Sequence, residues 1–216
     1  MVTLTEDEVD DLIYFARANE ADDFKTTLAE LSTSKSVAPL EVLTAAVDAG
    51  KNTPLHMAGA NGHKDIVSLI LSEIKSGEKP ARQSFLDATN SFGNTALHWA
   101  AMNGHLDVVK LLVEEGGASP ALANDKNYVA LDLAGLNDKV AVVDYFLASA
   151  EKAEKAEEAA AKGASTNNGE GSSLDKATAN LDLNKEGSAD ADEEEEVVVM
   201  KATREGDEIV FSAEKK

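Results

Sequence analysis

Apolar residues in the first two thirds of the chain fall into short groups that return at a fixed interval. Residues 66–71 read Ile-Val-Ser-Leu-Ile-Leu, and residues 108–113, which lie 42 positions later, read Val-Val-Lys-Leu-Leu-Val. Apolar positions three to four residues apart predict an amphipathic helix with one face in a core. Because the pattern occurs twice with the same neighbours, we expect one helical unit to be repeated along the chain.

The residues that precede each of these helices repeat at the same interval. Thr53–Ala58 (TPLHMA) returns as Thr95–Ala100 (TALHWA), and Asn61-Gly62-His63 returns as Asn103-Gly104-His105. A weaker copy, Val129–Ala134 (VALDLA), follows 34 residues later. Each copy therefore predicts a first helix, a tight turn and a second helix.

The residue types at these positions suit the boundaries of a helix. Thr53 and Thr95 are expected to cap its amino terminus, and Pro54 suits the first turn, where no amide donor is required. Gly62 and Gly104 are expected to end it in a left-handed turn.

This combination resembles the ankyrin repeat, whose T-P-L-H-x-A signature is intact at Thr53-Pro54-Leu55-His56 and returns at Thr95, Leu97 and His98. The resemblance covers about residues 5–148. It implies an all-α solenoid of about four helix-turn-helix units with short projecting turns, at approximately 5–46, 47–86, 87–122 and 123–148, inside a domain of residues 1–150. It also implies that the signature histidines form hydrogen bonds across the turns between units.

Two connections are longer than the resemblance predicts. The family period is about 33 residues, so each 42-residue interval holds about nine extra residues. We place them near Ser32–Ala45 and Ser72–Arg82, which are polar and contain Pro39 and Pro80.

The tips of the projecting turns are marked by residues that tolerate positive φ. Gly93 and Asn127 occupy this position in two units. Lys51 occupies it in the unit before, which predicts a turn shifted by one residue there.

Composition excludes several classes of site. The chain has no cysteine, hence no disulfide, zinc finger or thiol nucleophile. All four histidines (56, 63, 98 and 105) lie in the repeat signature, none with the short spacing of a metal pair. Because no P-loop, G-x-S-x-G or G-x-G-x-x-G motif occurs either, we expect a protein that is not an enzyme and has no catalytic residues, metal or cofactor.

Net charge points to the kind of partner. The chain carries 20 basic and 40 acidic side chains, a net charge of −20. Residues 1–31 alone contain nine acidic side chains against Arg17 and Lys25. An acidic surface repels nucleic acid and anionic membranes and attracts basic proteins. The amino-terminal residues MVTLTEDEVDD lack a basic start and an apolar stretch, so we expect no secretory signal.

The last third of the chain has a different character. Glu151–Lys162 is rich in Ala, Glu and Lys and is expected to extend the last repeat helix. Gly163–Gly187 is polar, which predicts disorder. Two β-prone runs then predict a short β segment within 197–212, inside an acidic low-complexity tail of residues 151–216.

Partner binding is expected on the concave side, as in ankyrin folds, with acidic residues of the amino-terminal unit at its rim. Phe92, Met102, Tyr128 and Leu136 predict an apolar stripe for an amphipathic basic helix. The full set of expected partner-binding residues is Asp10, Asp11, Asp22, Asp23, Asn52, Asn61, Phe92, Asn94, Met102, Asn103, Asp125, Tyr128 and Leu136.

The whole layout, with its acidic cap and tail, resembles the fungal ankyrin-repeat chaperones of a newly made ribosomal protein. That resemblance implies a basic client, small-subunit ribosomal protein three, which has a KH domain. It further implies a one-to-one complex, a cytoplasmic and nuclear location, and no direct contact with nucleic acid or membrane. The alternative is a regulatory scaffold that binds a signalling or transcription protein.

Overall fold

The computed structural model describes residues 2–164, 198–205 and 208–215. Two compact units, Met1–Asn168 and Gly169–Lys216, are described separately. In its described residues the amino-terminal unit is built of helices and turns alone. This confirms the predicted all-α repeat architecture.

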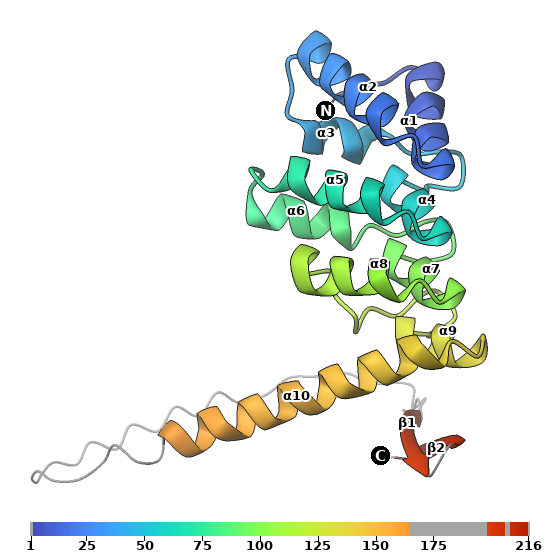
Figure 1. The fold of residues 1–216 in the computed structure, drawn as a ribbon, viewed down its shortest axis with the longest axis vertical. Coiled ribbons are helices and arrows are strands. Elements are labelled where there is room, and N and C mark those ends of the chain that lie inside the picture. Colours follow the sequence, from blue (N-terminus) through green and yellow to red (C-terminus); the bar gives the residue numbers. More distant parts are fainter. Residues whose placement is uncertain (1, 165–197, 206–207, 216) are drawn as a thin grey trace, which may run out of the picture. The chain divides into compact units, whose positions relative to one another are not determined.

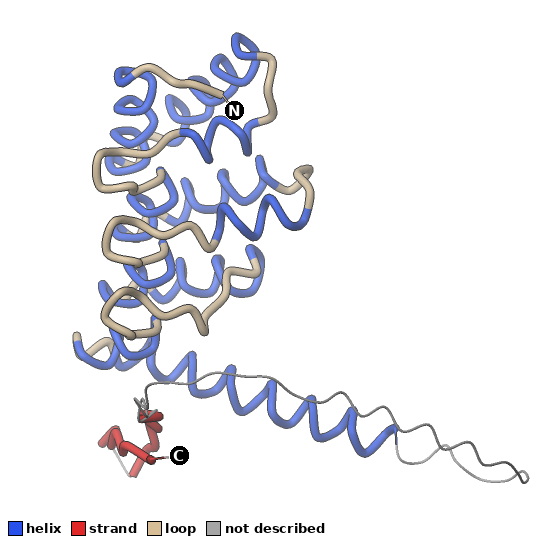
Figure 2. Tube along the Cα trace, turned by 180° about the vertical axis from the view of Figure 1, so that it is seen from behind, coloured by secondary structure: helices blue, strands red, loops and turns tan. Residues whose placement is uncertain are grey.

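Two columns of helices run the length of the amino-terminal unit (Figure 1). The inner column contains α1 (Glu6–Ala18), α4 (Pro54–Asn61), α7 (Ala96–Asn103) and α9 (Ala130–Leu136). The outer column contains α2 (Ala21–Lys35), α5 (Lys64–Ile74), α8 (Leu106–Lys110), the π-helix η1 (Leu111–Gly116) and the start of α10 (Val140–Ala164). The connections before α4, α7 and α9 project together on one side (Figure 2).

The inner helices begin and end where the sequence predicts. Thr53 and Thr95 are the N-caps of α4 and α7, and Pro54 lies in the first turn of α4. Gly62 and Gly104 follow the two helices with φ of +74° and +80°. A side chain at Gly62 would also collide with the ring of His105, so glycine is required there for space as well as for φ.

The extra residues of the first two units lie in or next to the stretches predicted for them, but they form a third column of helices rather than polar connections. They fold as α3 (Pro39–Ala45) and α6 (Lys79–Leu86), each with its proline in the first turn. Leu43 of α3 and Phe85 of α6 are buried. The added residues therefore enlarge the core.

The turn before α4 is not shifted, contrary to the prediction from Lys51. Lys51 itself adopts φ of +59°, beside +71° at Gly93 and +61° at Asn127 in the equivalent turns. The surrounding hydrogen bonds thus impose one turn geometry on three different residue types.

The core runs between the columns and is made of aliphatic residues with small residues at the helix contacts. Leu55 and Leu97 on the inner column, and Ile66 and Leu112 on the outer column, are buried. Leu111, which belongs to the apolar group 108–113, is half-buried. It begins the π-helix, whose wider turn rotates the side chains away from the α-helical register.

Helix α10 continues the last repeat to Ala164 and includes Gly163. The remaining residues of the predicted disordered stretch and the acidic run 190–196 lie outside the described residues. In the carboxy-terminal unit, β1 (Val198–Glu205) pairs antiparallel with β2 (Glu208–Lys215), with Val198 opposite Lys215. No helix in the described ranges is long and apolar enough to cross a membrane.

Candidate functional site

The projecting turns are each organised by one side chain at their first position. The Oδ1 atom of Asp48 accepts hydrogen bonds from the backbone N–H groups two and four residues later, both at 2.8 Å. Asn90 does the same at 2.9 and 3.1 Å, and Asn124 does so at 3.0 Å for both. A single carboxylate or amide oxygen thus holds each turn, as Asx turns do.

Neighbouring turns are joined by amide side chains. Nδ2 of Asn90 donates to Oδ1 of Asn52 at 2.9 Å, and Nδ2 of Asn124 donates to Oδ1 of Asn94 at 2.7 Å. Asn52 and Asn94 were expected to contact a partner. In the structure their side chains bond within this ladder, and both are half-buried.

A second set of bridges comes from the signature histidines. Nδ1 of His56 accepts from the N–H of Thr53 at 3.1 Å, and its Nε2 lies 3.0 Å from the carbonyl oxygen of Asn94 in the next turn. His98 repeats this with Thr95 and with the carbonyl of Tyr128, also at 3.1 and 3.0 Å. Since Nδ1 accepts a hydrogen bond from an amide N–H, the ring hydrogen must be on Nε2, which donates a hydrogen bond to the carbonyl oxygen in the next turn.

The surroundings of these two rings favour the neutral form. Both side chains are 1% exposed, and burial lowers the pKa of His56 and of His98 below its ordinary value, although the carbonyl at Nε2 partly opposes this shift. In the described residues, moreover, no three His, Asp or Glu side chains are grouped so that they could hold a metal ion. The histidines therefore act as structural bridges.

Exposed apolar side chains gather at the turn tips and the ends of the last inner helices. Phe92 at a turn tip is 66% exposed, Leu136 at the end of α9 is 63% exposed, and Tyr128 is 37% exposed. Met102 of the predicted stripe is half-buried. Val47, which precedes the turn before α4, is also exposed, and sequence reasoning missed it because no motif marks it.

Of the remaining polar residues predicted to contact a partner, Asn61 and Asn103 bond within the repeats, and Asp125 has a carboxylate that is free in the described part of the chain. The amide of Asn103 donates to the carbonyl of Ala60 in the preceding unit at 2.7 Å, and that of Asn61 donates to Met57 in its own helix at 2.8 Å. Asp125 is exposed at a turn tip, and its backbone N–H donates to the carbonyl of Phe92 at 3.3 Å. Among the described residues its carboxylate has no hydrogen bond or ion pair. Its carboxylate is therefore available to a partner.

The first repeat carries a group of exposed carboxylates. Asp10 and Asp11 are exposed on α1, and Asp22 and Asp23 are exposed in the first turn of α2; we call these four the cap aspartates. None of them forms an ion pair within the described residues. Glu8, by contrast, is paired with Lys35 at 3.0 Å and completes the N-cap of α1 with Thr5.

Comparison with known proteins supports the repeat assignment over most of the helical unit. The family model described as ankyrin repeats (3 copies) matches residues 74–157, and the model described as ankyrin repeat matches residues 50–77. No match was found among curated protein sequences.

Among solved structures, a chain in the crystal structure of the yeast ribosomal protein Rps3 in complex with its chaperone Yar1 is similar. It is 36% identical with a TM-score of 0.61, and the match covers 68% of this chain and 95% of that chain. These findings indicate a protein-binding module rather than an enzyme. The chain belongs to the ankyrin-repeat family.

Proposed function

We propose that this protein is a dedicated chaperone of a basic ribosomal protein, namely small-subunit ribosomal protein three. The observation that carries the proposal is the 36% identity over 95% of a chain from the Rps3–Yar1 complex. The protein would hold its client in a one-to-one complex, in the cytoplasm and the nucleus, until the client joins the assembling small subunit.

Charge provides the physical reason for this pairing. A ribosomal protein presents Lys and Arg side chains that are meant for rRNA phosphates, and these attract other nucleic acids before assembly. A chain with net charge −20 and unpaired cap aspartates can substitute for the phosphates. Long-range attraction of this kind speeds association and weakens as salt is added.

The exposed apolar residues complete the binding surface in the proposal. Phe92, Tyr128 and Leu136 would receive the apolar face of a client helix, whose basic face would lie toward Asp125 and the cap aspartates. Aromatic and aliphatic anchors supply most of the affinity at such interfaces, while rim charges chiefly set the rate and the specificity of association.

The test is direct binding of the full chain to purified ribosomal protein three. Light scattering after gel filtration should show a one-to-one complex, and the association rate should fall clearly between low and high salt. Lysozyme, an unrelated basic protein, is the control. Equal binding of lysozyme, or affinity that is flat with salt, would contradict the proposal. Affinity purification that recovers a neutral or acidic signalling partner instead would favour the scaffold alternative.

A further inference from the structure

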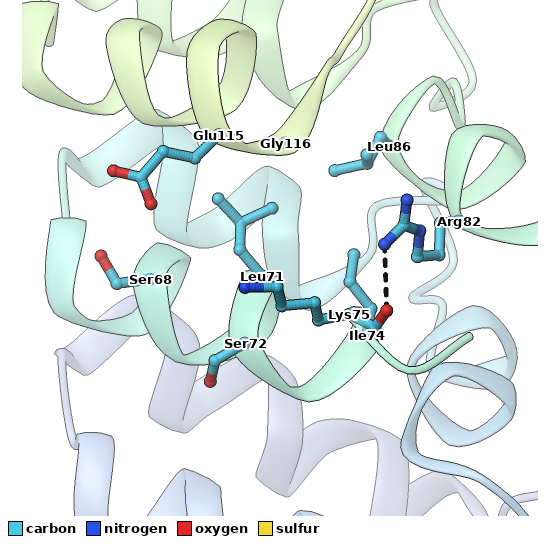
Figure 3. A pocket seen from close by; sticks show the side chains of 9 residues that line it. All are labelled: Ser68, Leu71, Ser72, Ile74, Lys75, Arg82, Leu86, Glu115 and Gly116. Atoms are coloured by element: carbon cyan, nitrogen blue, oxygen red, sulfur yellow. Dashed lines mark hydrogen bonds between the residues drawn. The ribbon is translucent and has the colours of Figure 1, made fainter. Parts of the chain in front are cut away.

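A pocket of about 410 Å³ opens between the outer column and the third column (Figure 3). It lies between the carboxy-terminal end of α5, helix α6 and the end of η1. Its walls include Leu71, Ile74, Lys75, Arg82, Leu86 and Glu115. The walls combine the apolar side chains of Leu71, Ile74 and Leu86 with serine hydroxyls and charged groups.

The repeat shows why the pocket exists at this interface. A shift of 42 residues places Gly116 of the third unit where the second unit has Ile74, which is 2% exposed. The same shift places Arg82 of the second unit where the first unit has Leu40, which is also buried. A Cβ atom at Gly116 would point between Leu71 and Leu86, at 3.1 and 3.5 Å from their Cδ2 atoms. At this interface a glycine and an arginine thus stand where the preceding interface has two buried aliphatic residues, and the pocket lies beside the guanidinium group.

The pocket is flanked by cations without an ionic partner. Among the described residues, neither Lys75 nor Arg82 forms an ion pair, and Nη1 of Arg82 donates to the carbonyl oxygen of Lys75 at 3.0 Å. With Lys79, residues 75–82 contain three cations and one acid, Glu78, in a chain of net charge −20. Of these three cations, Lys75 and Arg82 line the pocket, whereas Lys79 lies outside its walls.

Acidic groups near the pocket limit what it can accept. Glu115 lies on the wall contributed by η1, and it has no ion pair in the described part of the chain. Asp87 is already bonded to Gln83 and Ser119, at 2.7 and 2.8 Å. Glu115 would repel a second carboxylate at its end of the pocket, so a ligand must carry its negative charge toward Lys75 and Arg82.

We propose that this pocket binds an acidic segment of a second partner protein. An aliphatic side chain of the segment packs on Leu71 and Leu86, and its carboxylates pair with Lys75 and Arg82. Charge complementarity and the apolar cavity select this chemistry over a basic ligand. The inference goes beyond the proposed function, because the outer column and the turn surface could be occupied together.

The probe is a fluorescein-labelled peptide, Gly-Ser-Asp-Glu-Leu-Asp-Glu-Ser-Gly, added to the full chain at low salt. Fluorescence anisotropy should report saturable binding, and amide NMR shifts should concentrate around Leu71, Leu86 and Gly116. Arg82→Glu should weaken binding by about tenfold or more, as expected when a charge-assisted contact becomes repulsive. Lys79→Glu makes the same change of net charge outside the pocket and should change affinity far less.

A second variant keeps the test independent of the Arg82 hydrogen bond. Gly116→Leu fills the apolar interior without changing charge and should abolish peptide binding, with folding checked by thermal melting. Glu115→Gln should strengthen binding. Equal loss with Arg82→Glu and Lys79→Glu, or full binding by Gly116→Leu, would overturn the proposal, as would shifts confined to other faces.

Discussion

The side chain of Asn90 offers a quantitative test of how the projecting turns are held. It is 5% exposed and forms three hydrogen bonds, from the N–H groups of Phe92 and Asn94 and to Oδ1 of Asn52. A buried neutral hydrogen bond contributes about 1 kcal/mol net. Asn90→Ala should therefore lower the free energy of unfolding by about 3 kcal/mol.

Asn90→Asp separates the two functions of this side chain. It keeps the oxygen that accepts from both turn amides, but it loses the N–H that donates to Oδ1 of Asn52. It also places a carboxylate oxygen next to that Oδ1 atom, which repels it. We expect a loss of about 1–2 kcal/mol, intermediate between wild type and Asn90→Ala. Asn124→Ala, in the exposed last turn, should be milder than Asn90→Ala because water can replace its bonds.

Urea unfolding followed by far-UV circular dichroism measures these differences. With a slope of about 2 kcal/mol per molar urea, the midpoint should fall by about 1.5 M for Asn90→Ala. Ser91→Ala, at an exposed neighbouring position, should change stability by less than about 0.5 kcal/mol. A loss below about 1 kcal/mol for Asn90→Ala would refute the view that this residue holds the turn and its neighbour together.

Four further outcomes are expected. Replacing Phe92 and Tyr128 together by Ala should abolish client binding while leaving the melting temperature nearly unchanged; unaltered affinity would remove the turn surface from consideration. Changing all four cap aspartates to Asn should slow client association measured by stopped flow, whereas each single change should do little because exposed pairs contribute about 0.2–1 kcal/mol. Burial lowers the pKa of His56 and His98, so the unfolded chain binds more protons than the folded chain as the pH falls below 6.5. The free energy of unfolding should therefore be largest above pH 6.5 and should fall as the pH drops toward the folded-state pKa. Urea midpoints that do not change between pH 7.5 and 5.5 would contradict this. Deleting residues 151–216 should leave the urea midpoint of the repeats within experimental error, and a large drop would show that the deleted part supports them.

The repeat signature made the inner helices predictable from sequence, since Thr, Pro, His and Gly each have a local physical role at Thr53, Pro54, His56 and Gly62. The helices of the third column were not predicted because both connections are rich in polar residues, which suggested loops. Pro80 in a helical first turn, followed by buried Phe85 and Leu86, was the signal that could have revealed it. The left-handed Lys51 was not expected because lysine rarely adopts positive φ, although bonds to Asp48 within the same turn hold it there. No motif in the sequence marks the π-helix.

The turn residues Asp48, Asn90 and Asn124 were also missed. They recur at the same 42- and 34-residue intervals as the signature, but Asp and Asn are common in loops, so the recurrence did not stand out. The amides of Asn90 and Asn124 also donate to a neighbouring turn, which sequence does not show. For the same reason Asn52 and Asn94 were predicted to contact a partner. Sequence shows that a turn residue is polar, but it does not show whether its side chain already forms a hydrogen bond with a neighbouring turn.

The histidine bridges also give the solenoid a direction and an end. The bridges of His56 and His98 run forward, from a ring in one unit to a carbonyl in the next. His63 and His105 bridge backward, to the carbonyls of Arg17 and Ala60 in the preceding units, at 2.8 and 3.0 Å. The forward bridges prepare a unit for its successor. The last unit has Asp132 in place of histidine, and its Oδ2 accepts from the N–H of Val129 at 2.9 Å. A carboxylate has no proton to offer a following turn, and at this point the chain enters α10 instead. Asp132 therefore ends the series of forward bridges, and adding a fifth repeat by design would first require histidine at this position.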